Sequence, residues 1–178
     1  MTNATATTTL RHPRKGWSID YPADWQMTRL YPSATPPESA PEVDFGFAID
    51  ERASDPDGWL GVWFNRMPPH ALRLPQLMVL AHELPALRFE AFADAMREKL
   101  TRMGGTELRR EDGLTLAGLP AGEYAYALGA RRIRLRLTWY EGLRLAVFFA
   151  GDERAHLIAS RGFDQLAAGL RVNTEEKR

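Results

Sequence analysis

Cysteine is absent from this sequence of 178 residues. No disulfide framework, thiolate zinc site, iron–sulfur cluster or cysteine nucleophile can therefore form. A lipid anchor attached through cysteine is excluded for the same reason. Any site chemistry in this chain must use other side chains.

An excess of charge of one sign is also missing. The 23 basic and 23 acidic residues give a formal net charge of zero, so no overall field attracts nucleic acid or an anionic membrane. Lysine is scarce: the chain has 20 arginines but only three lysines, which are Lys15, Lys99 and Lys177. Arginine suits carboxylate or phosphate recognition, but the balancing acids favour a plain compositional bias. We expect no nucleic-acid partner.

Long hydrophobic runs do not occur. The longest, Leu77–Ala81 and Leu145–Ala150, are far shorter than the roughly 20 residues that cross a bilayer. Residues 1–10 are rich in threonine and alanine and lack the apolar segment of a signal peptide. These absences predict a cytoplasmic protein without membrane insertion.

Motifs of the common catalytic and metal sites are missing as well. There is no nucleophile elbow, phosphate-binding loop or dinucleotide fingerprint. His82 and Glu83 begin a zinc-protease motif, but Pro85 intrudes and the second histidine is absent. Asp55 and Asp57 favour a turn over a calcium site. The histidines are scattered, which favours solvated or core roles: His12, His70, His82 and His156. We expect no catalytic residue, metal or cofactor, and no enzyme.

The chain divides into a predicted disordered leader (1–15), one domain (16–172) and a frayed tail (173–178). Alternating apolar residues predict a strand over Gly16–Tyr21 that ends at Pro22. The remaining patterns of the first half predict strands at 26–31, 44–50 and 59–67, with exposed loops at 33–42 and 53–58. Prolines at 68, 69 and 75 break any regular element, and residues 76–84 read as either a helical turn or a buried strand.

Two helices are predicted. Apolar residues spaced by three and four positions give a helix after residue 88, with Gly104 at its C-terminal end and Glu98 paired with Arg102. A second helical region follows Gly151, and Asp152 is the expected N-cap. Gly162 is expected to divide this region into two pieces.

The segment 124–149 reads as three antiparallel strands. Gly129–Ala130 form a two-residue turn of type II′, which pairs residue 126 with residue 133. For the next turn we expect a three-residue loop ending at Gly142, because a two-residue loop would place Trp139 opposite Arg144 and mix polar with apolar positions on each face. In that register residue 135 pairs with residue 147. Ile133 and Leu135 then lie on the same face of the sheet as Leu145 and Val147.

The segments GWSIDYPADW, GLPAGEYAYAL, RRIRLRLTWYEGLRLAVFFAG and FDQLAAGLRV, with the helix between the first two, resemble in this order the PsbP-like superfamily. That group includes photosystem-II extrinsic proteins, Ran-binding nuclear-import factors and many bacterial domains. The resemblance covers about residues 16–172. It implies an α+β fold, a central antiparallel β-sheet with helices packed on its faces.

The resemblance also implies a binding or assembly role, which chaperones of type VI secretion effectors exemplify among bacterial relatives. We therefore expect a non-catalytic, chaperone-like domain that binds another protein. An acidic partner and a homo-oligomer are open alternatives. The opposing reading is a small-ligand binder or enzyme that uses a cleft between the sheet and residues 68–84.

Two surfaces are candidates for partner binding. The first is a set of arginines on the sheet face that points away from Ile133 and Leu135: Arg132, Arg134, Arg136 and Arg144. Of these, only Arg136 has a carboxylate, that of Glu123, directly across from it on the neighbouring strand. Pairing with acids of a covering helix is the favoured alternative. The second surface is formed by Trp59 and Trp63, which are core residues if a helix covers them.

Overall fold

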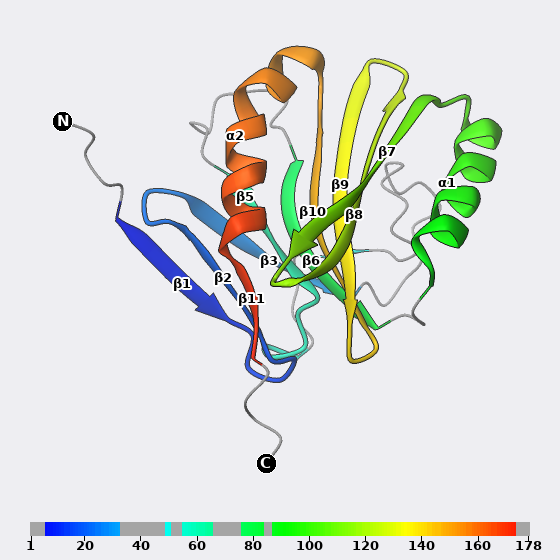
Figure 1. Cartoon of the computed structure of the whole chain (residues 1–178). Coiled ribbons are helices and arrows are strands. Elements are labelled where there is room, and N and C mark those ends of the chain that lie inside the picture. Colours follow the sequence, from blue (N-terminus) through cyan, green and yellow to red (C-terminus); the bar gives the residue numbers. More distant parts are fainter. Residues whose placement is uncertain (1–5, 33–48, 51–54, 66–75, 84–86, 174–178) are drawn as a thin grey trace.

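The computed structural model of the protein describes residues 6–32, 49–50, 55–65, 76–83 and 87–173. Two antiparallel sheets form its centre (Figure 1). The smaller sheet has the strand order β1-β2-β11, and the larger has the order β4-β3-β5-β6-β10-β9-β8-β7. Helix α2 lies on one face of the larger sheet and α1 on the other, so the expected α+β architecture is confirmed.

The elements follow the chain in the order β1 (Thr7–Arg11), β2 (Trp17–Pro22), β3 (Gln26–Pro32), β4 (Ile49–Asp50), β5 (Gly61–Asn65), β6 (Gln76–Glu83), α1 (Phe89–Met103), β7 (Thr106–Leu116), β8 (Leu119–Leu128), β9 (Arg131–Tyr140), β10 (Leu143–Gly151), α2 (Glu153–Gly169) and β11 (Leu170–Val172). The predicted strands at 16–21 and 26–31 correspond to β2 and β3. For residues 76–84, the strand alternative is correct over β6.

The predicted disordered leader needs correction, because Thr7–Arg11 form strand β1 and pair with β2. Threonine is β-branched and favours a strand once a partner edge is available. Leu10 packs against the core and His12 is buried. Strand β11 is a second element that the sequence patterns did not predict, and it pairs with the other side of β2.

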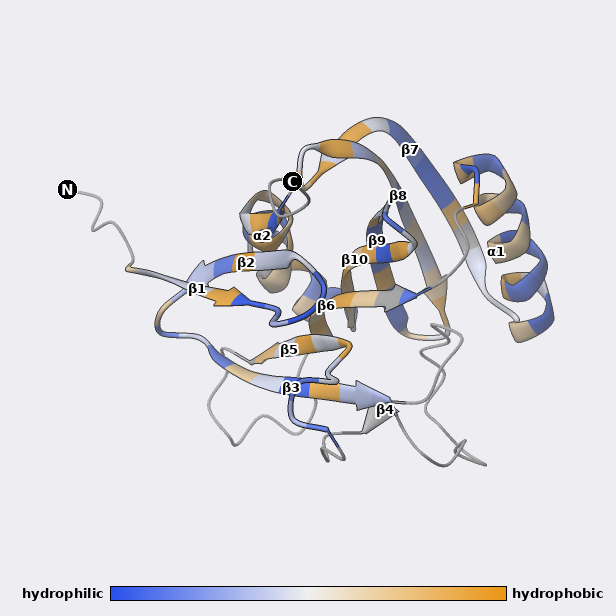
Figure 2. Cartoon of the chain, turned by 90° about the horizontal axis from the view of Figure 1, so that it is seen from below, coloured by the Kyte–Doolittle hydropathy of each residue, from blue (hydrophilic) through white to orange (hydrophobic). Residues whose placement is uncertain are grey.

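Helix α1 matches the prediction, with Gly104 in the left-handed conformation at its end. Its buried residues face the sheet, and the hydrophilic colouring lies mostly on its outer side (Figure 2). Helix α2 begins as predicted, since the Asp152 carboxylate accepts from Ala155 N at 2.7 Å. Gly162 does not divide it. A Cβ atom at Gly162 would lie 2.9 Å from the Trp25 ring, so this glycine permits close packing.

The β8–β9 hairpin has the predicted register, with Tyr126 opposite Ile133. The register predicted for β9 and β10 is wrong. Glu141 and Gly142 form a two-residue loop with φ values of 46° and 81°, and Trp139 lies opposite Arg144. Positive φ at both positions is the geometry of a type I′ hairpin turn, which suits the strand twist.

The central sheet is consequently buried on both faces. One core lies on the α2 side and includes Leu145 and Val147. The other lies on the α1 side and includes Ile133 and Leu135. A strand covered on both faces carries a nearly continuous apolar run, as in Leu145–Ala150, rather than a strict alternation.

Several predictions fall on residues outside the described ranges. They concern the loop at 33–42, all but the last two residues of the strand at 44–50, the first part of the segment 68–84, His70, and the tail after residue 173.

Candidate functional site

The predicted arginine surface is a covered ion-pair network rather than an open patch. Arg134 and Arg136 project from β9 toward α2, and both donate to the Glu123 carboxylate of β8. The Arg136 Nε–Glu123 Oε2 distance is 2.7 Å. Glu123 itself is buried. Two guanidinium groups thus offset the cost of burying one carboxylate.

Helix α2 completes this network. The Asp164 carboxylate accepts from Arg134 Nη2 at 3.0 Å, and the Arg134 guanidinium carbon lies 4.1 Å from the centre of the Phe163 ring. The Ser160 hydroxyl accepts from Arg134 Nη1 at 3.4 Å. The alternative in which acids pair with the arginines beneath a covering helix is therefore the observed arrangement. The network fastens α2 to the sheet.

The other two arginines of that set lie elsewhere. Arg132, between Ala127 and Gly151 in the sheet, is partly exposed. Arg144 is on the opposite face, against the prediction, because the two-residue turn shifts β10 by one position. Its guanidinium carbon lies 5.8 Å from the centre of the Phe92 ring of α1, and burial lowers the Arg144 pKa. The four arginines do not form one surface.

The two tryptophans are separated as well. Trp59 is 1% exposed and packs in the α2-side core, where its ring centre lies 5.2 Å from that of Trp17. Trp63 packs on the α1 side and is partly buried. Strand β5 begins at Gly61, so the alternation expected for 59–67 does not extend back to Trp59. Trp59 is a core residue, and Trp59 and Trp63 do not form a pair that a partner could bind.

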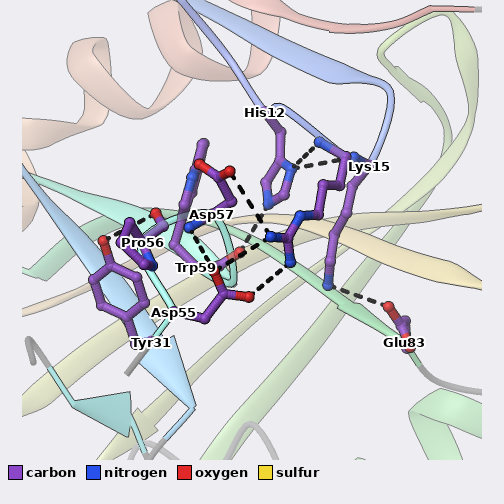
Figure 3. Close-up of polar contacts among 9 residues, drawn as sticks. His12, Lys15, Tyr31, Asp55, Pro56, Asp57, Trp59 and Glu83 are labelled. Atoms are coloured by element: carbon purple, nitrogen blue, oxygen red, sulfur yellow. Dashed lines mark hydrogen bonds and ion pairs between the residues drawn. The ribbon is translucent and has the colours of Figure 1, made fainter. Parts of the chain in front are cut away.

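A buried histidine joins the two sheets (Figure 3). His12 Nε2 lies 2.8 Å from the carbonyl oxygen of Trp59, and Nδ1 accepts from the backbone N–H groups of Arg14 and Lys15, each at 3.1 Å. Nε2 must therefore carry the proton and donate. Burial lowers the His12 pKa, and Lys15 and Arg14 add to this effect. Both ring nitrogens are occupied by structural contacts.

Charged side chains surround this His12 joint. Arg14 Nη1 donates to the Asp55 carboxylate at 2.7 Å, and Lys15 Nζ lies 3.4 Å from the Glu83 carboxylate. The Asp55 carboxylate also accepts from the backbone N–H of Asp57 at 3.1 Å. The turn predicted for Asp55 and Asp57 is therefore present. Among the described residues, no group of three or more histidine, cysteine or acidic side chains is placed to hold a metal ion.

The outer side of α2 presents an apolar residue between two arginines. Leu157 is 77% exposed, the largest value among the large hydrophobic residues described. Arg154 and Arg161 precede and follow it by three and four positions, so all three share one side of the helix. We call these three residues the α2 outer face. The sequence patterns did not single them out, because their spacing also fits an ordinary solvated helix.

Two solved structures are similar to the chain over nearly its whole length. The solution structure of a cyanobacterial PsbP, CyanoP from Synechocystis, matches with a TM-score of 0.56 and 14% identity, covering 96% of this chain and 95% of that chain. The chain has a PsbP-like fold. The crystal structure of LpqN from Mycobacterium tuberculosis matches with a TM-score of 0.53 and 12% identity, covering 94% of this chain and 91% of that chain. Neither a protein-family model nor a curated protein sequence matches.

The PsbP-like fold confirms the predicted resemblance and corrects the expected location. LpqN is involved in cell envelope biogenesis, which points away from the cytoplasmic location predicted from the sequence. That expectation rested on absences: no cysteine for a lipid anchor, no long hydrophobic run and no apolar segment in residues 1–10. Within the described residues, no helix is long and apolar enough to cross a membrane.

Proposed function

We propose that this PsbP-like protein is a non-catalytic accessory protein that binds another protein and supports its assembly. The fold supports this role, because LpqN, a neighbour of the same fold, takes part in the biogenesis of the cell envelope. The contacts of two buried polar side chains, His12 and Glu123, also support this role. Both nitrogens of His12 and both oxygens of Glu123 are engaged in contacts within the chain.

The opposing function, a small-ligand binder or enzyme, is not favoured by any described residue. It depends on a cleft beside residues 68–84. Of these, Gln76–Glu83 form β6, which lies between β5 and β10 in the sheet and is not positioned as a lid. Residues 68–75 and 84, His70 and the His82 side chain lie outside the described part.

The observation that carries the proposal is the α2 outer face. Leu157 projects from a helix whose opposite side packs against the larger sheet, where Gly162 lies close to the Trp25 ring. The helix is also held by Asp164, seven positions after Leu157, which pairs with Arg134 of β9. A fixed helix loses little conformational freedom when a partner binds. An apolar anchor with a charged rim is the usual composition of a protein interface, and arginines favour an acidic partner.

Co-purification from the source cells tests this role. Tagged wild-type protein is compared with Leu157→Asp and with the double variant Arg154→Glu/Arg161→Glu, and captured proteins are quantified by mass spectrometry. Leu87→Asp is the matched control, because Leu87 is the other exposed leucine among the described residues, at 48%. We expect both α2 variants to lose one specific partner by more than about tenfold and the control to retain it. Equal capture by all four proteins contradicts the proposal.

A further inference from the structure

Strand β1 ends the smaller sheet, and within the described part of the chain its outer edge is open. The sheet order is β1-β2-β11, so no described strand pairs with β1 on the side away from β2. Figure 1 shows β1 as the outermost strand on that side of the molecule. The side chains of Thr7, Thr8, Thr9 and Arg11 are all exposed.

The pairing with β2 determines which backbone groups of β1 point outward. Ala23 N donates to Ala6 O at 2.8 Å, and His12 N donates to Trp17 O at 2.9 Å. In an antiparallel pair, hydrogen-bonded positions alternate. The even-numbered residues of β1 therefore bond to β2. The N–H and C=O groups of Thr7, Thr9 and Arg11 face away from the sheet, which gives six outward backbone groups.

Two other terminal strands, β7 and β11, have features that prevent further pairing. Strand β7 has two register shifts, at Thr106/Arg109 and Glu111/Leu114, and a run of charged residues at 109–112. Strand β11 is three residues long. Bulges, charges and short length are the usual protection of sheet edges. Strand β1 has five residues, three of them threonines, and one charge.

We propose that β1 pairs antiparallel with β1 of a second copy of this chain, about a two-fold axis at Thr9. Thr9 then lies opposite Thr9 of the second copy, and Thr7 lies opposite Arg11 of the second copy. This register satisfies all six outward groups of each strand. A shift by two residues leaves some of them unpaired, and a shift by one turns inward-facing groups toward the partner.

The charges permit this register. Arg11 is the only charged residue of β1. In the two-fold arrangement, the two Arg11 residues are four positions apart along the strands, which is roughly 14 Å. That separation exceeds the Debye length of about 8 Å at physiological salt. Asp20 accepts a hydrogen bond from the Thr9 hydroxyl at 2.6 Å and lies on the neighbouring strand β2 of the same chain. The two sheets join into one of six strands without opposed like charges.

Cysteine cross-linking of the full chain tests the register, because the natural sequence has no cysteine. In the proposed dimer, two cysteines at position 9 face each other at a Cα separation of about 5.5 Å, which a disulfide can span. Two cysteines at position 8 are about 8 Å apart, which is too far. We expect mild oxidation to give a covalent dimer of Thr9→Cys and little of Thr8→Cys.

Sedimentation over a range of protein concentrations tests the association itself. We expect the wild type and Thr9→Val to shift from monomer to dimer mass. Thr9→Lys should remain monomeric, because it opposes two charges across the axis. Thr9→Val controls for loss of the hydroxyl. A monomeric wild type without cross-linking at position 9 overturns the proposal, as does a dimer that Thr9→Lys leaves intact. A monomer whose β1 instead binds an extended segment of another protein also overturns it. This inference does not depend on the proposed function, because none of its variants lies on α2.

Discussion

His12 Nε2 donates a hydrogen bond to the carbonyl oxygen of Trp59 across 2.8 Å, and this contact ties the smaller sheet to the larger one. The opposite ring nitrogen accepts two backbone N–H groups, those of Arg14 and Lys15. A proton added at Nδ1 would face two donors, so both bonds must break on protonation. The joint is therefore intact only while His12 is neutral.

Because of this histidine, the protein should become less stable as the pH decreases. The His12 pKa is lowered from 6.5, mainly by burial, so the unfolded chain binds the proton first. The stabilisation is complete above a pH of about 6.5 and is lost as the pH falls through the lowered value. Lys15, Arg14, Asp55, Asp57 and Glu83 are the charged groups around the joint.

Urea unfolding at several pH values between 7.5 and 5 checks this prediction. We expect the wild type to lose stability over this interval more steeply than His12→Gln, which cannot titrate. At pH 7.5 the variant should be less stable by about 1–3 kcal/mol, the cost of unsatisfied buried polar groups. Parallel pH curves for the two proteins would contradict a titrating joint at His12.

The ion pairs beneath α2 should differ greatly in their contributions. Glu123→Gln leaves two arginines under the helix without their shared carboxylate, and breaking a buried ion pair costs about 3 kcal/mol or more. Asp164→Asn is the matched control, because the Asp164 side chain is 56% exposed; it should cost no more than about 1 kcal/mol. Equal losses for both variants, measured by chemical denaturation, would mean that Glu123 is not the centre of the network.

Gly162→Ala tests the close packing of α2 on Trp25. Alanine favours a helix over glycine by about 1 kcal/mol, but its Cβ would lie 2.9 Å from the Trp25 ring. We expect the substitution to destabilise the wild type and to stabilise a Trp25→Leu background, where the space is larger. A double-mutant cycle of unfolding free energies measures this coupling. A gain of stability in both backgrounds would contradict the contact.

Local signals predicted the elements whose cause is local. The Gly129–Ala130 turn set the β8–β9 register, Gly104 ended α1, and Asp152 capped α2. The predicted turn between β9 and β10 was wrong, because the prediction assumed that one face of the sheet is solvated. Here α1 and α2 cover both faces, so mixed positions such as the Trp139–Arg144 pair are accommodated.

Elements with distant partners were not predictable in the same way. Thr7–Arg11 become a strand only because β2 offers an edge, and His12 is buried only where two sheets meet. Within the predicted arginine surface, only the pairing of Arg136 with Glu123 could be predicted from the sequence, because it follows from the strand register. The cover by α2 depends on tertiary packing, which no local pattern encodes. The same limit applies to Leu157, whose exposure is decided by the orientation of the whole helix.

Photo-cross-linking at position 157 tests the central claim, that the α2 outer face binds a partner protein. A photoreactive amino acid replaces Leu157 in one variant and Leu87 in another, and both proteins are irradiated in the source cells. We predict one discrete adduct with a second protein at position 157 and none at position 87. An adduct at position 87 alone, or no adduct at either position, would contradict it.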